Sequence, residues 1–223
     1  MTHSLLRKIE DSPVLARVAP FILFAALTSA QGLFGEASRY WLYLIKTIAG
    51  AWLVWTVRPW VSEMRWKISW EGIAAGFAVF ALWIGLDGLY PTMSSVGEAW
   101  NPHEHFGAQS AAAWFFIFVR VIGSALVVPP LEEVFYRSFL YRYIVNPGFQ
   151  SVALGHFGWT PFLATAAIFG FVHFEWLPAV LCAFVFQGLV VWKKRLGDAI
   201  TAHAITNFLL GLWVVWKGAW HFW

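Results

Sequence analysis

The chain has 223 residues, of which 60% are hydrophobic and only 12% are charged. Soluble domains carry about 25% charged residues, so this composition indicates an integral membrane protein and excludes an ordinary soluble domain. The net charge of +3 is small, which gives no support to a nucleic-acid partner. The single cysteine, Cys182, excludes an intrachain disulfide and any multi-cysteine metal site. The lipid bilayer is the first partner that the sequence predicts.

Apolar runs recur along the chain, and most approach the ~20 residues that a membrane-spanning helix needs. Together they predict an all-α, polytopic transmembrane helix bundle that forms one membrane domain over residues 1–223. Its most motif-rich part covers about residues 110–216. The expected helices are 18–34, 40–57, 72–89, 110–145, 161–174, 178–192 and 198–216.

The fourth run allows two threadings, because Pro129 and Pro130 interrupt it. Residues 110–145 form either one long helix kinked at the prolines, giving seven spans, or two separate crossings, giving eight. Seven spans place the basic segment 193–195 on the same side as the N-terminal residues Arg7 and Lys8, as the positive-inside rule requires. We therefore expect seven spans in a plasma membrane (the inner membrane of a bacterium), with a cytoplasmic N-terminus.

Smaller features have weaker implications. Gly72 and Gly76 form a G-x-x-x-G pair, which permits close helix contact but is common in membrane sequences. Lys46 lies inside the second run, and the pattern gives it no chemical role. Asp198 is expected to cap the last helix. The segment His103-Glu104-His105 resembles a metal ligand set, but adjacent spacings do not converge on a helix face, which favours a solvated loop in the stretch 91–109.

Three polar groups interrupt otherwise apolar helices. The first is Glu132-Glu133 with Arg137; the four-residue spacing places Glu133 beside Arg137, while Glu132 points about 100° away and keeps an unpaired charge. The second is His173, four residues after Phe169. The third is His203 with Asn207, again four apart. Ionisable groups inside a bilayer are costly and are candidate functional residues.

These three groups are similar to the motifs of one family. EEVFYR matches E-E-x-x-x-R, FGFVH matches F-x-x-x-H and HAITN matches H-x-x-x-N, in that order over about residues 125–210. The chain thereby resembles the CAAX prenyl endopeptidase and bacteriocin-processing (CPBP, or Abi) family of intramembrane proteases. Its tryptophan-rich first half is similar to CAAX-protease-related proteins of bacteria with exosortase sorting systems. Family members of known structure have eight spans, one more than expected here.

The resemblance implies an endopeptidase that cleaves a protein or peptide substrate reached from the membrane. It assigns water activation to Glu132 and His173, the oxyanion to His203 and Asn207, and orientation of the site to Glu133 and Arg137; Phe169 is expected to pack. The family has been described both with and without a metal. Glu132, His173 and His203 include ligand types that zinc accepts, but they lie on separate helices, and no metal is required by the pattern.

Two other readings stay open. A catalytically silent binding or chaperone-like protein can share the same scaffold, although the complete set of motif residues favours an enzyme. A transporter would also place polar residues inside helices, but transporters often contain inverted repeats, and none is evident here.

Overall fold

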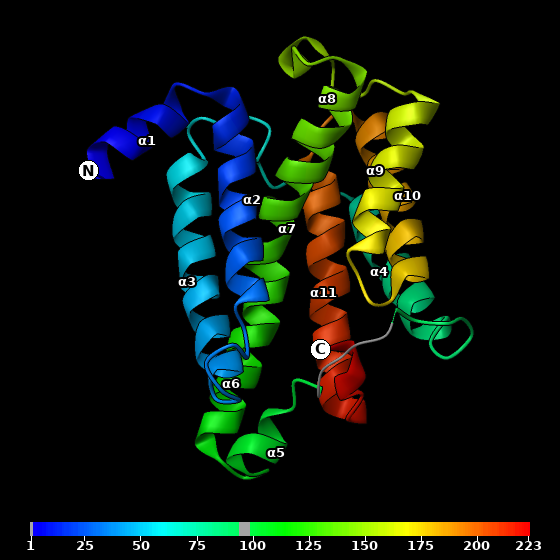
Figure 1. Cartoon of the computed structure of the whole chain (residues 1–223). Coiled ribbons are helices and arrows are strands. Elements are labelled where there is room, and N and C mark those ends of the chain that lie inside the picture. The colour runs from blue at the N-terminus through cyan, green and yellow to red at the C-terminus, as the bar shows by residue number, and fades with distance from the viewer. Residues whose placement is uncertain (1, 94–98) are drawn as a thin grey trace.

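The computed structural model describes residues 2–93 and 99–223, and within them the chain forms helices and no strand. Long helices stand side by side in a bundle (Figure 1). The predicted helix bundle is therefore confirmed. The described helices are α1 (Thr2–Glu10), α2 (Pro13–Ser29), α3 (Ser38–Val57), α4 (Trp70–Gly85), α5 (Pro102–Phe106), α6 (Ala111–Ile122), α7 (Val128–Glu133), α8 (Tyr141–Val145), α9 (Trp159–Phe171), α10 (Trp176–Lys193) and α11 (Gly197–Lys217).

Residues 111–145 form one continuous helical segment of 35 residues. Two π-helical turns, Gly123–Val127 and Val134–Leu140, separate α6, α7 and α8 within it. The prolines lie in the first turn of α7, where a missing backbone N–H is tolerated most easily. The irregularity of this helix thus appears as π turns on both sides of α7, and π turns are frequent at functional sites.

Three segments are long and apolar enough to cross a membrane: Ala111–Val145, Trp176–Lys193 and Gly197–Lys217. Pro13–Ser29, Trp70–Gly85 and Trp159–Phe171 are apolar but shorter. The length and apolar character of these helices are those of a membrane protein. The number of times the chain crosses the membrane stays a prediction. At 1.5 Å per residue, α9 is only about 20 Å long, less than a ~30 Å hydrocarbon core.

The G-x-x-x-G pair lies where α4 packs on α11. A Cβ atom on Gly76 would come within 2.8 Å of the Ala202 carbonyl oxygen and of Ile205 Cβ. On Gly72 it would lie 3.1 Å from the carbonyl oxygen of Asp198. Thr206 also donates a hydrogen bond to the Gly76 carbonyl at 3.0 Å. The glycines therefore allow the backbones of α4 and α11 to touch, which places the His203 region of α11 inside the bundle.

The connections that carry most of the basic residues meet at one end of the bundle. Lys193 pairs with Glu71 at 2.8 Å, joining the end of α10 to the start of α4. Asp198 is buried in the first turn of α11, where Arg195 and Ser69 bond to its carboxylate. The expectation that Asp198 caps α11 is wrong, because the helix already begins at Gly197 and Leu196 holds the cap position.

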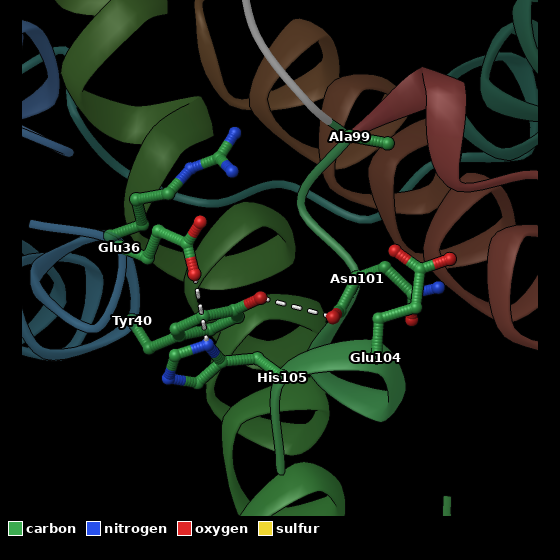
Figure 2. A pocket seen from close by; sticks show the side chains of 7 residues that line it. Glu36, Tyr40, Ala99, Asn101, Glu104 and His105 are labelled. Carbon is green, nitrogen blue, oxygen red and sulfur yellow. Dashed lines mark hydrogen bonds and ion pairs between the residues drawn. The ribbon is translucent and has the colours of Figure 1, made fainter. Parts of the chain in front are cut away.

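The opposite end holds a polar cavity of about 300 Å³, shown in Figure 2. Tyr40 donates a hydrogen bond to the Asn101 carbonyl at 3.0 Å, and His105 Nδ1 lies 3.8 Å from Glu36 Oε2. The solvated loop expected around 103–105 is instead a short helix, α5, docked on Tyr40 through ring contacts. Residues 94–98 of the stretch 91–109 lie outside the described residues.

Candidate active site

The long helix brings Glu133 and Arg137 into the centre of the bundle. Both side chains are fully buried, and Arg137 Nε lies 3.2 Å from Glu133 Oε2, as the four-residue spacing predicted. The Arg137 guanidinium lies over the Phe169 ring, 4.5 Å from its centroid, and near Phe186 at 5.9 Å. Phe169 therefore does more than pack, because its ring faces the buried cation.

His203, on the second turn of α11, binds the same carboxylate. Its Nδ1 lies 2.9 Å from Glu133 Oε1, and both residues are buried. The imidazole also stacks on Phe186, with ring centroids 5.3 Å apart. Because Nδ1 faces the carboxylate, the orientation of the ring is set and Nε2 is left to interact elsewhere.

His173 is held differently. The helix α9 ends at Phe171, so His173 lies in the turn before α10 rather than on a helix as expected. Its Nδ1 lies 2.6 Å from the Phe169 carbonyl oxygen, the group that a helical residue four positions later would normally bond. The ring thus satisfies a carbonyl at the helix end, and the tautomer with a proton on Nδ1 leaves Nε2 as an acceptor.

The helices α9 and α10 approach very closely where α9 ends. A Cβ atom on Gly170 would lie 2.2 Å from Val180 Cγ2 and 3.1 Å from the Trp176 carbonyl oxygen, so a larger residue here would require the two helices to shift. Loop residues cover the turn: Met93 N donates to the Phe174 carbonyl at 3.1 Å, and Trp176 Nε1 donates to the Pro91 carbonyl at 2.9 Å. These contacts fix the position of His173 relative to the loop after α4.

Glu132 follows Leu131 on α7 and is half-buried. Its Oε2 atom is buried and has no hydrogen-bond partner among the described residues. The expectation that Glu132 carries a carboxylate not neutralised by Arg137 agrees with this geometry, since the described ion pair of Arg137 is made with Glu133.

Asn207 lies one turn beyond His203 on α11. Its Nδ2 atom donates a hydrogen bond to the carbonyl of Ser124 at 2.9 Å. Ser124 belongs to the π turn Gly123–Val127, whose irregular backbone leaves carbonyl groups available. One amide proton of Asn207 is thus engaged by this carbonyl.

The structure therefore gathers Glu133, Arg137 and His203 through direct contacts. Phe169 connects His173 to this group, since its carbonyl bonds to His173 and its ring faces Arg137. Among residues 2–93 and 99–223, no group of three or more His, Cys, Asp or Glu side chains is arranged to hold a metal ion. The zinc set Glu132, His173 and His203 is accordingly not gathered in this arrangement. None of the six expected site residues lines the cavity of Figure 2.

Sequence reasoning missed two groups at this site. Phe186 stacks on His203, and Trp83 contacts the edge of the His173 ring with centroids 6.3 Å apart. Both are aromatic residues within apolar helices, and nothing in their spacing distinguishes them from ordinary packing residues.

Comparison with known proteins agrees with the motifs. Residues 112–209 match the family model described as type II CAAX prenyl endopeptidase Rce1-like. The matched part holds all six site residues and is similar to the Rce1-like members of the CAAX/CPBP family of membrane proteases. No curated protein and no solved structure matches the chain.

Proposed function

We propose that the protein is an intramembrane endopeptidase that hydrolyses a peptide bond near the C-terminus or the membrane-proximal part of a protein substrate. The observation that carries this proposal is the different anchoring of two imidazoles. His173 Nδ1 meets a neutral carbonyl, whereas His203 Nδ1 meets the Glu133 carboxylate. A neutral partner suits a base, and an anionic partner suits an imidazolium donor.

In this mechanism, Glu132 and the Nε2 atom of His173 take a proton from a water molecule as its oxygen attacks the scissile carbonyl. The same pair returns the proton to the amide nitrogen, which leaves as an amine when the C–N bond breaks. The protonated His203 donates from Nε2 to the oxyanion that develops, and the Asn207 amide supplies a second donor. Glu133 orients His203, and Arg137 holds the Glu133 carboxylate in place. The match to the Rce1-like family model supports a protease at the level of the family, and the matched part spans all of these residues.

The proposal is tested by comparing membrane and secreted proteins by mass spectrometry in cells with the intact protein and with Glu132→Gln. The intact protein should generate at least one cleavage product that the Glu132→Gln variant does not generate, when the two proteins are present in equal amounts. His173→Gln should give the same loss, because each residue supplies half of the water-activating pair.

One outcome would contradict the enzyme, and another would contradict the role of Glu132. Identical cleavage products in all strains would favour the catalytically silent scaffold. Full activity of Glu132→Gln on a verified substrate would remove Glu132 from the mechanism. The cut site would define the substrate class and show whether prenylation is involved.

A further inference from the structure

Lys46 is a buried cation whose described contacts are with a hydroxyl group and two aromatic rings, none of which carries a negative charge. It is 6% exposed in the middle of α3. Its Nζ atom donates one hydrogen bond, to Thr28 Oγ1 at 3.0 Å, and lies over the Phe24 and Tyr43 rings at 4.9 and 4.3 Å. Hydroxyl and ring contacts only partly replace water around an ammonium group, so a buried cation of this kind requires a negative charge nearby.

The packing of α3 brings Lys46 to the helix that carries Glu132. One turn after Lys46, a Cβ atom on Gly50 would lie 2.7 Å from Val127 Cγ1 and 3.3 Å from Leu131 Cδ1. Phe24, whose ring holds the ammonium group, packs against the same Val127 and Leu131. Leu131 directly precedes Glu132. Lys46 and Glu132 therefore lie at one junction of α2, α3 and α7.

The other charges near this junction have their own partners. Glu133 is bound by Arg137 and His203. Arg120 lies over the rings of Tyr43, Trp100 and Trp223. Glu132 remains, with a buried Oε2 atom that lacks a hydrogen-bond partner in the described structure.

We propose that Lys46 is the counter-charge of Glu132 and a positioning residue of the active site, an inference that rests on the proposed function. The charge of Glu132 acts on Lys46, yet no direct ion pair joins them in the described part of the chain. This separation suits catalysis. A carboxylate bound directly to an ammonium group has its lone pairs occupied, whereas a cation a short distance away favours the ionised form and leaves the lone pairs for water.

A double-mutant cycle tests the pairing without any substrate. Thermal stability in detergent is measured for Lys46→Gln, Glu132→Gln and the double variant. If the two charges balance each other, each single variant leaves one buried charge unmatched, so the double variant loses less stability than the sum of the singles. The matched control is Lys217→Gln, because the Lys217 ammonium also lies over an aromatic ring, that of Trp216, at 3.8 Å. The stability losses of Lys217→Gln and Glu132→Gln should simply add. The proposal would be overturned if the stability losses of Lys46→Gln and Glu132→Gln simply added in the double variant, or if the double variant did not fold.

Activity on a verified substrate gives the second readout. Lys46→Gln should lower kcat with little change in KM, and Lys46→Arg should restore most of kcat because it keeps the charge. Thr28→Val, which removes only the hydrogen-bond partner, should leave kcat near that of the wild type. Equal kcat for Lys46→Gln and the wild type would overturn the positioning role. The two charges could be coupled in the stability cycle while the wild type cleaves no substrate. That result would contradict the proposed function and leave the pairing of Lys46 with Glu132 intact.

Discussion

Glu133 and His203 are 70 residues apart in sequence, and their side chains meet at 2.9 Å in the buried centre of the bundle. The contact joins the E-E-x-x-x-R segment of the long helix to the H-x-x-x-N segment of α11. It also sets the orientation of the imidazole, because the Glu133 carboxylate is itself held by Arg137. Asn207, one turn further along α11, bonds to Ser124 in the π turn Gly123–Val127 of the same long helix.

Asn207→Ala should lower kcat by ~10²-fold or more with a smaller effect on KM, because an oxyanion donor acts mainly in the transition state. The matched control is Thr206→Val on the same helix turn. Its hydroxyl bonds to the Gly76 and Ala202 carbonyls, so this change should reduce stability and leave kcat near the wild-type value. Kinetics on a verified substrate, with melting temperatures for both variants, provide the measurement. An effect of Asn207→Ala limited to KM would assign it to substrate positioning.

Gly76→Ala should destabilise the protein by about 1–3 kcal/mol, the usual cost of forcing an extra methyl group into a filled contact. The added atom meets backbone and a β-branched side chain on α11, neither of which can move aside easily. Gly188→Ala on α10 is the control, since no atom lies within 4 Å of its added Cβ. Unfolding in detergent should separate the two variants. Equal melting temperatures would show that α4 and α11 are not held in this contact.

Sequence patterns were sufficient for the helix class and for interactions within one helix. The helix bundle and the Glu133–Arg137 pair follow from residue type and spacing. The spacing of Gly72 and Gly76 only permitted a close contact, and the structure shows that α11 is the helix that makes it. The Glu133–His203 contact did not follow, because it depends on how two distant helices are rotated about their axes. The end of α9 before His173 was also missed, since the apolar run continues to Phe174 and only the Gly170–Val180 contact shows that the chain turns there.

Extensive chelation should leave cleavage unchanged if Glu132 and His173 activate water without a metal. The reason is geometric: the Nδ1 atoms of His173 and His203 are held by Phe169 and Glu133, and the three side chains of the zinc hypothesis are not gathered. The measurement is turnover before and after chelation, together with the metal content of the purified protein. Stoichiometric zinc whose removal abolishes activity, and whose return restores it, would contradict this prediction.

The loop residue Glu63 should make stability sensitive to acid. Burial opposes its ionisation, but a hydrogen bond from Ser138 and the charge of Arg17 outweigh burial and hold its pKa below the usual 4.5. A carboxylate with a lowered folded-state pKa stabilises the protein above its unfolded-state pKa, and this contribution is lost as pH falls through the folded-state value. Arg142, which also bonds to Glu63 at 3.0 Å, loses its anionic partner in the same range.

Melting temperatures should therefore fall as pH drops below about 4.5. Glu63→Gln should be less stable than the wild type at pH 7, where it leaves two arginines unpaired, and the difference should shrink in acid. Glu10→Gln, at an exposed position of α1, is the control and should match the wild type throughout. A constant difference between Glu63→Gln and the wild type at all pH values would contradict the assignment.

The long helix makes the clearest prediction about topology. Its 35 residues correspond to about 52 Å, enough for one crossing but not for two crossings of ~20 residues each. Gln109 and Gly148 flank this helix, so cysteines placed there in a Cys182→Ala background should react with an impermeant probe from opposite sides. We expect Gly148→Cys to react from the cytoplasmic side, because the end of the helix near it lies with the basic connections: Arg142 and Arg17 both bond to Glu63 of the α3–α4 connection. If both cysteines react from the same side, residues 111–145 cross the membrane an even number of times. Glu132 would then lie away from the middle of the bilayer, and the convergence of the three motifs on one buried site would have to be abandoned.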